Sequence, residues 1–168
     1  MRPSANDYAP YYSRYIDLIE GENILHLLNE QSIKTQQILN SFPEWKGNYA
    51  YAEGKWTVKQ VIGHLMDVER IMAYRALCIA RNEKKPLPSM EQDDYVREGR
   101  FNERELFDLN YEFRLIRETN MLLFKSFDEE ILSRKGIAAE KEVSVLALLF
   151  IIAGHEKHHI DVLKEKYL

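Results

Sequence analysis

The chain has one cysteine, Cys78, which excludes an internal disulfide and fits the reducing cytosol. It has only seven glycines and five prolines in 168 residues, too few for the many tight turns of an all-β fold. No run approaches the roughly 18 apolar residues of a membrane-spanning helix, and the first ten residues lack the apolar core of a signal peptide. These shortages predict a soluble, cytoplasmic, helical protein.

An excess of positive charge is missing as well. The 27 acidic and 23 basic side chains give a formal net charge of -4. A protein that binds nucleic acid usually carries a basic stripe that neutralises phosphates, so we expect no nucleic-acid partner. The length and the apolar content of 45% are enough for one domain with its own core, and we predict a single domain over residues 1–168.

Apolar residues recur with the period of a helix in four segments, and these predict helices near 23–40, 57–81, 102–127 and 144–166. Residues 1–20 are expected to form an irregular arm that packs on the body, and 82–101 a long connection with an acidic cluster. Thr57 and Gln60 have the spacing of a capping box, and Asn102 is a candidate N-cap. The pattern predicts an all-α four-helix bundle. The segment 57–81 is apolar nearly all round, which suggests a homodimer contact.

Three of the five histidines lie between positions 155 and 159. His155 and His159 are four residues apart, so on a helix they share one face, as two imidazoles must to bind one metal. They lie about 60° and 20° from Ile152, which belongs to the core stripe, whereas His158 lies about 120° away. His64 also falls on an inward stripe, from a different helix. The three histidines could therefore meet in the bundle interior.

Two interpretations of these histidines remain open at this point. Each could be a core residue hydrogen-bonded to a protein partner, since a buried polar group left unpaired costs about 1–3 kcal/mol. Alternatively, His64, His155 and His159 bind a divalent transition metal and leave one or two coordination positions open, as in catalytic sites. Imidazole ligands suit zinc, nickel, iron or copper and disfavour magnesium and calcium.

Several polar residues near these histidines have expected roles. Glu156 and Asp67 are candidates to touch the pocket, orient the imidazoles and handle protons, whereas Glu69 is expected to point away as a solvated or interface charge. Arg75 lies about 16 Å along the helix from His64 and is expected to form a structural ion pair, with Asp93–Asp94 as candidate partners.

Both tryptophans, Trp45 and Trp56, are expected to wall one end of the bundle. Cys78 lies on the inward side well below the histidines, and we interpret it as a small core residue rather than a nucleophile.

Two stretches of the sequence resemble the signatures of a known family. Residues 51–70, which contain His64, and residues 154–159 resemble the DinB/YfiT-like superfamily, and residues 74–77 and 93–96 also look like its members. The resemblance covers nearly the whole chain. It implies an up-down-down-up four-helix bundle, often dimeric, in which His64, His155 and His159 hold a metal ion.

The resemblance also suggests an activity. Some relatives are thiol S-transferases that use a low-molecular-weight thiol such as bacillithiol or mycothiol, and others are regarded as metal-dependent hydrolases. A metal-dependent enzyme of the thiol S-transferase type is therefore the leading hypothesis. A hydrolase and a non-catalytic metal-binding module of a stress response are the alternatives.

Overall fold

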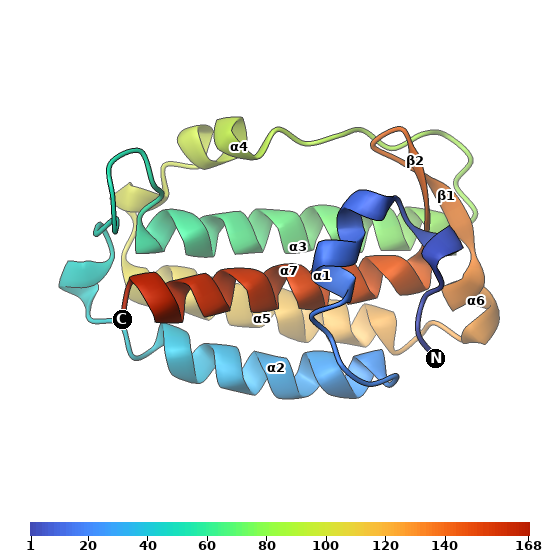
Figure 1. Cartoon of the computed structure of the whole chain (residues 1–168), viewed down its shortest axis with the longest axis horizontal. Coiled ribbons are helices and arrows are strands. Elements are labelled where there is room, and N and C mark those ends of the chain that lie inside the picture. Colours follow the sequence, from blue (N-terminus) through green and yellow to red (C-terminus); the bar gives the residue numbers. More distant parts are fainter.

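Four long helices lie side by side in the computed structural model, which describes residues 1–168 (Figure 1). They are α2 (Ile24–Leu39), α3 (Val58–Ala80), α5 (Leu106–Phe124) and α7 (Val145–Lys166). The predicted four-helix bundle is confirmed. None of the helices is both long and apolar enough to cross a bilayer.

Three of the four helices, α2, α3 and α7, begin within one residue of the start that the sequence predicts. The capping box at the start of α3 is present, with Gln60 N donating to Thr57 Oγ1 and Thr57 N donating to Gln60 Oε1. Asn23 caps α2, and Ser144 caps α7 by accepting a hydrogen bond from the amide of Ala147. These side chains satisfy amides that have no partner within the helix.

Helix α5 begins at Leu106, four residues after the predicted cap at Asn102. The amide of Leu106 donates to Glu44 Oε2 at 2.8 Å, so a side chain from a distant segment serves as the cap. Asn102 instead lies within a short 3-10 helix at Phe101–Glu103, and its side chain accepts a hydrogen bond from the Thr57 hydroxyl at 2.6 Å. The prediction was wrong here because it considered only local caps.

The order of helix directions is up-down-down-up. In Figure 1, α3 and α5 run from left to right and α2 and α7 run from right to left. The connection between α3 and α5 must therefore return along the outside of α3, and it contains the short helix α4 (Gln92–Glu98). Asp93 and Asp94 lie in the first turn of α4, where negative charge interacts favourably with the helix dipole. The predicted acidic loop is thus partly helical.

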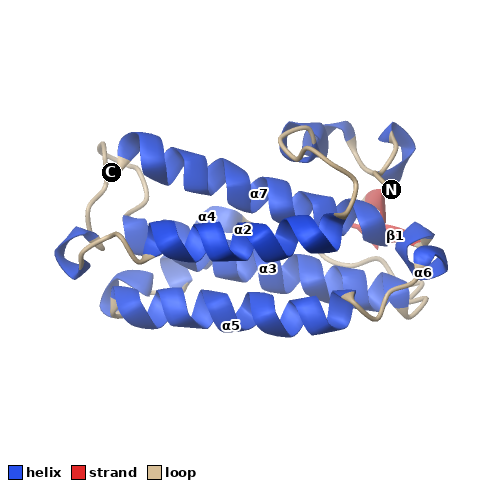
Figure 2. Cartoon of the chain, turned by 90° about the horizontal axis from the view of Figure 1, so that it is seen from below, coloured by secondary structure: helices blue, strands red, loops and turns tan.

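The remaining segments are short and lie around the bundle (Figure 2). The N-terminal arm contains 3-10 helices at Ala5–Asp7 and Pro10–Tyr12 and helix α1 (Ser13–Ile16), which packs on α7. Helix α6 (Glu129–Ser133) precedes an antiparallel hairpin of β1 (Lys135–Ala138) and β2 (Lys141–Ser144). The sequence indicated only a turn region at this place.

The arm touches the backbone of α7 at Gly154. A Cβ atom at Gly154 would lie 2.1 Å from the carbonyl oxygen of Tyr15, so a side chain at this position excludes the observed path of the arm. Glycine in the middle of a helix costs about 0.5–1 kcal/mol relative to alanine. Here it lets the arm lie directly beside His155.

The burial of α3 is explained within one chain. The helix packs against α7 and α5 and is also contacted by α4 and the Phe101–Glu103 turn. Its apolar character therefore needs no second subunit, and the homodimer stays a prediction, to be checked by light scattering.

Candidate metal centre

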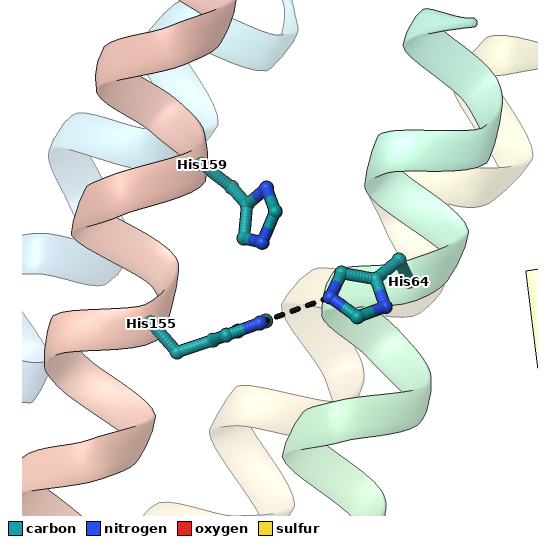
Figure 3. Close-up of side chains that lie close together, drawn as sticks. All are labelled: His64, His155 and His159. Atoms are coloured by element: carbon teal, nitrogen blue, oxygen red, sulfur yellow. Dashed lines mark hydrogen bonds between the residues drawn. The ribbon is translucent and has the colours of Figure 1, made fainter. Parts of the chain in front are cut away.

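The three predicted histidines converge from two neighbouring helices (Figure 3). His64 extends from α3, and His155 and His159 extend from successive turns of α7. The Nε2 atoms of His64 and His155 are 2.9 Å apart, and one ligand nitrogen from each of the three rings lies within 4.8 Å of the other two. The structure thus brings the whole predicted triad together.

The donor set and the spacing of its closest pair fit a transition-metal ion. Imidazole nitrogens bind such an ion at about 2.0–2.1 Å, and two of them at angles of 90–110° are then about 2.9–3.4 Å apart. The separation of 2.9 Å between His64 and His155 falls in this range. One hydrogen bond joins these two rings, and no protein group forms a hydrogen bond with His159.

Burial keeps the three imidazoles in the neutral form that binds metals. Loss of hydration lowers the pKa of His64 to about 4. Burial, reinforced by the charges of His64, His158 and Arg14, lowers the pKa of His159 to about 3. The pKa of His155 is held well below its usual value by burial and then by the charge of His159. At neutral pH, protons therefore compete little for the lone pairs.

Aromatic rings surround the triad. The Trp56 ring lies 4.7 Å from the His64 ring and stacks over His159 at 6.4 Å between centroids. Tyr15 of the arm contacts His155 edge-on at 5.3 Å. The expectation that Trp56 walls the end of the bundle is therefore confirmed, whereas Trp45 is 79% exposed and walls nothing. Sequence reasoning gave Tyr15 no such place, because the arm has no helical period that indicates which way its side chains point.

The triad faces cavities that a small molecule could enter. One of about 310 Å³ is lined by His64, His155 and Tyr15 and continues along α3 to Arg75. Others, of about 330 and 280 Å³, lie on the Trp56 and His159 side. The exposed His158 flanks the centre, as its helical phase predicts.

A buried ion network lies behind the triad. Arg117 of α5 binds Glu69 through Nε and Nη2 at 2.7 and 2.8 Å, and its Nη2 also donates to Glu156 Oε2 at 2.5 Å. All three side chains are at most 3% exposed. The expectation that Glu69 points away as a solvated or interface charge was therefore wrong, because Glu69 is buried inside the bundle. Its partner comes from another helix, which the periodicity of α3 alone does not show.

The two carboxylates expected beside the metal do not contact the histidines. Glu156 is bound to Arg117, although it follows His155 directly in the sequence. Asp67 is partly buried and makes no hydrogen bond. Burial raises the pKa of its carboxyl group, the charge of Arg70 lowers it to a smaller extent, and the charge of Glu112 raises it slightly. The structure therefore does not bring Glu156 and Asp67 into the centre as partners of the imidazoles.

Arg75 forms no ion pair, contrary to the expectation from the sequence. Its guanidinium donates to the Pro88 carbonyl oxygen at 2.7 Å and contacts Met72 Sδ at 3.6 Å. The carboxylate of Asp94 pairs instead with Arg97 on α4. Cys78 is partly buried and packs against the apolar core, as expected.

Comparisons with known proteins agree with this fold. A protein of Oceanobacillus iheyensis, whose name proposes a metal-dependent hydrolase, is 22% identical over 76% of this chain and 74% of its own length. YfiT from Bacillus subtilis superposes on this chain with a TM-score of 0.74 at 14% identity, over 91% of this chain and 95% of its own. It is described as a probable metal-dependent hydrolase with an unusual four-helix bundle topology.

A mycothiol-dependent maleylpyruvate isomerase also superposes, with a TM-score of 0.70 at 12% identity. The match covers 90% of this chain and 62% of that enzyme. At this level of identity the likenesses to solved structures show the fold. Residues 27–163, a span that includes all three histidines, match the model of the DinB superfamily, and the chain therefore belongs to this superfamily.

Proposed function

We propose that the protein is a metal-dependent enzyme in which His64, His155 and His159 hold a divalent transition-metal ion. The observation that carries the proposal is the convergence of three neutral imidazoles, two buried and one partly buried, at the junction of cavities. Three protein ligands leave coordination positions for a substrate atom. A bound ion would lower the pKa of a thiol or of a water molecule at such a position.

The reaction we favour is the transfer of a low-molecular-weight thiol to an electrophile. No carboxylate forms a hydrogen bond or an ion pair with the three histidines: Glu156 binds Arg117, and Asp67 forms no hydrogen bond. Hydrolases with helical histidine pairs commonly use a glutamate beside the metal as the general base. A thiol needs no such base once its pKa is lowered, and the likeness to a mycothiol-dependent enzyme supports this choice.

The protein's own groups would shape this reaction. Trp56 and Tyr15 cover two sides of the triad and limit the access of water. Cavities reach the triad from two sides, one beside His159 and one beside His64 and His155, and either gives a small molecule access to it. In the transfer step the sulfur forms a bond to the electrophilic carbon, the leaving group departs with its electron pair, and the thiol proton passes to solvent.

Metal analysis of the purified, untagged protein is the first test. We expect a stoichiometric transition metal that is lost in His64→Ala and retained in the matched control His26→Ala, because His26 is exposed on α2. A panel of thiols with monochlorobimane then tests the reaction. We expect the wild type to form the thioether and release chloride, and His64→Ala to do neither. A protein that binds no metal would refute the proposal.

Hydrolysis is the second candidate, because the names of two relatives point to it. The same preparations are assayed with ester and amide substrates. Turnover of these substrates, absent in His64→Ala and without thiol transfer, would favour the hydrolase. Stoichiometric metal with neither activity would favour a non-catalytic metal-binding module.

A further inference from the structure

Arg75 differs from the other buried cations of this protein. Three basic side chains are buried: Lys59, Arg75 and Arg117 are 6%, 4% and 2% exposed. Lys59 pairs with Glu44 at 2.7 Å, and Arg117 binds two carboxylates. Arg75 has no carboxylate partner, so its charge alone is left without a neutralising group.

The two contacts of Arg75 do not replace an anion. A carbonyl oxygen and a thioether sulfur take up two of the five N–H donors of the guanidinium and carry no negative charge. An arginine stays protonated at any physiological pH, and a buried charge without a partner is strongly unfavourable. The position therefore suits a ligand that supplies the missing negative charge.

Arg75 lines the same cavity as two histidines of the triad. This cavity of about 310 Å³ is bounded by His64 and His155 near one end and by Arg75 along α3. The Cα atoms of His64 and Arg75 are about 16 Å apart along the helix axis. Side chains on a helix lean toward its N-terminus, and the contact of Arg75 with Met72 shows this direction, so the guanidinium lies nearer to the triad than its Cα does.

The cavity has room for an anion at this place. Tyr12 and Tyr15 form part of its wall, and Glu91 is the one acidic residue that lines it. Glu91 is exposed and makes no ion pair with Arg75. The buried cation is thus available, and a fork of N–H donors matches a carboxylate or a phosphate in shape as well as in charge.

We propose that Arg75 binds an anionic group of the substrate whose reacting atom lies at the three histidines. This inference rests on the proposed function and narrows its substrate class. The substrate would be an elongated molecule with a carboxylate, phosphate or sulfonate on the order of 10 Å from the reacting atom. Arg75 is therefore a binding and specificity residue, and it takes no part in the chemical step.

The competing interpretation is that Arg75 only holds the connection after α3 through the Pro88 carbonyl. That role predicts no preference for anions. The two interpretations differ in a binding measurement, whereas loss of activity in an Arg75 variant would fit both.

The test uses the full-length protein loaded with cobalt(II), whose absorption reports a bound thiolate. The probes are ω-mercaptocarboxylic acids of increasing chain length and the ω-mercapto alcohols of equal length. We expect one range of lengths in which the acid binds about tenfold more tightly, or more, than the alcohol. Arg75→Met should abolish the preference and leave the affinity for the alcohol unchanged, and Arg75→Lys should keep part of it.

Arg14→Met is the matched control, because Arg14 lies exposed at the edge of the same centre. Equal affinities for acid and alcohol in the wild type would overturn the proposal. So would a preference that Arg14→Met removes and Arg75→Met retains. Because the wild-type comparison needs no variant, the proposal stays testable if Arg75→Met does not fold.

A second measurement separates this inference from the proposed function. If no thiol changes the cobalt spectrum, the thiol-transfer proposal fails. Calorimetric titration of the metal-free protein with medium-chain alkanoates and the corresponding alcohols then decides the role of Arg75. Heat of binding for the acid alone, lost in Arg75→Met, supports the anion site, and equal signals for acid and alcohol refute it.

Discussion

Replacement of Arg117 by methionine should destabilise the protein strongly. Glu69 and Glu156 are each 3% exposed and share this one cation. Without it, two carboxylates remain buried side by side with no positive charge between them. Removing one partner of a buried ion pair typically costs about 3–5 kcal/mol. For a domain of this size, that lowers the melting temperature by about 10 °C.

The same substitution at Arg114 is the control. Arg114 lies on the same helix, is 46% exposed, and is 3.5 Å from Glu118. An exposed pair of this kind contributes about 0–0.5 kcal/mol. Urea unfolding followed by circular dichroism gives both free energies of unfolding. If Arg117→Met and Arg114→Met differ by less than about 1 kcal/mol, the network does not hold the helices together as we infer.

The pH dependence of Arg117→Met provides a second check. Burial raises the pKa of Glu156, and the charge of Arg117 opposes this effect. Without Arg117, the pKa in the folded state rises further above that in the unfolded state, so stability is lost as the pH rises through it. The deficit should therefore be larger at pH 7 than at pH 5. Adding Glu69→Leu and Glu156→Leu should recover most of the loss, because a well-packed apolar set of similar volume is tolerated.

Three further predictions concern single positions. Gly154→Ala should displace the arm, because its Cβ would lie 2.1 Å from the Tyr15 carbonyl oxygen. Hydrogen exchange of the backbone amides should then become faster in residues 10–19 but not in α3. Unchanged exchange in the arm would contradict this. In the metal-free protein, burial lowers the pKa of His64 to about 4, so the unfolded chain binds more protons, and His64 alone should lower the stability by about 2 kcal/mol on acidification from pH 7 to pH 5. The lowered pKa values of His155 and His159 act in the same direction, so the total loss should be larger. Urea titrations check this, and His64→Gln should show a smaller loss. Thr57→Ala should cost about 1 kcal/mol through loss of the α3 cap, and equal urea midpoints would exclude that role.

The helix boundaries show what a sequence alone can predict. The starts of α2, α3 and α7 were predictable because Asn23, Thr57 and Ser144 cap amides three residues further along the chain. The start of α5 was not, because its capping group is the carboxylate of Glu44, 62 residues away. Pattern reasoning succeeds where the partner is local and fails where the fold supplies it.

The same distinction holds at the candidate site. Helical phase selected His64, His155 and His159, because direction on a helix follows from spacing alone. The surroundings of Glu69 and Arg75 depend on α5 and on the connection after α3, and spacing along one helix carries no information about either.

The contact between Gly154 and the arm has a consequence for comparing sequences with this fold. Any residue larger than glycine at this position excludes the path that places Tyr15 against His155. A homologue with alanine or serine there must carry its N-terminal segment elsewhere and leave the centre more open on that side. Glycine at position 154 is therefore a requirement for a tyrosine-walled centre of this kind, although glycine alone does not supply the tyrosine.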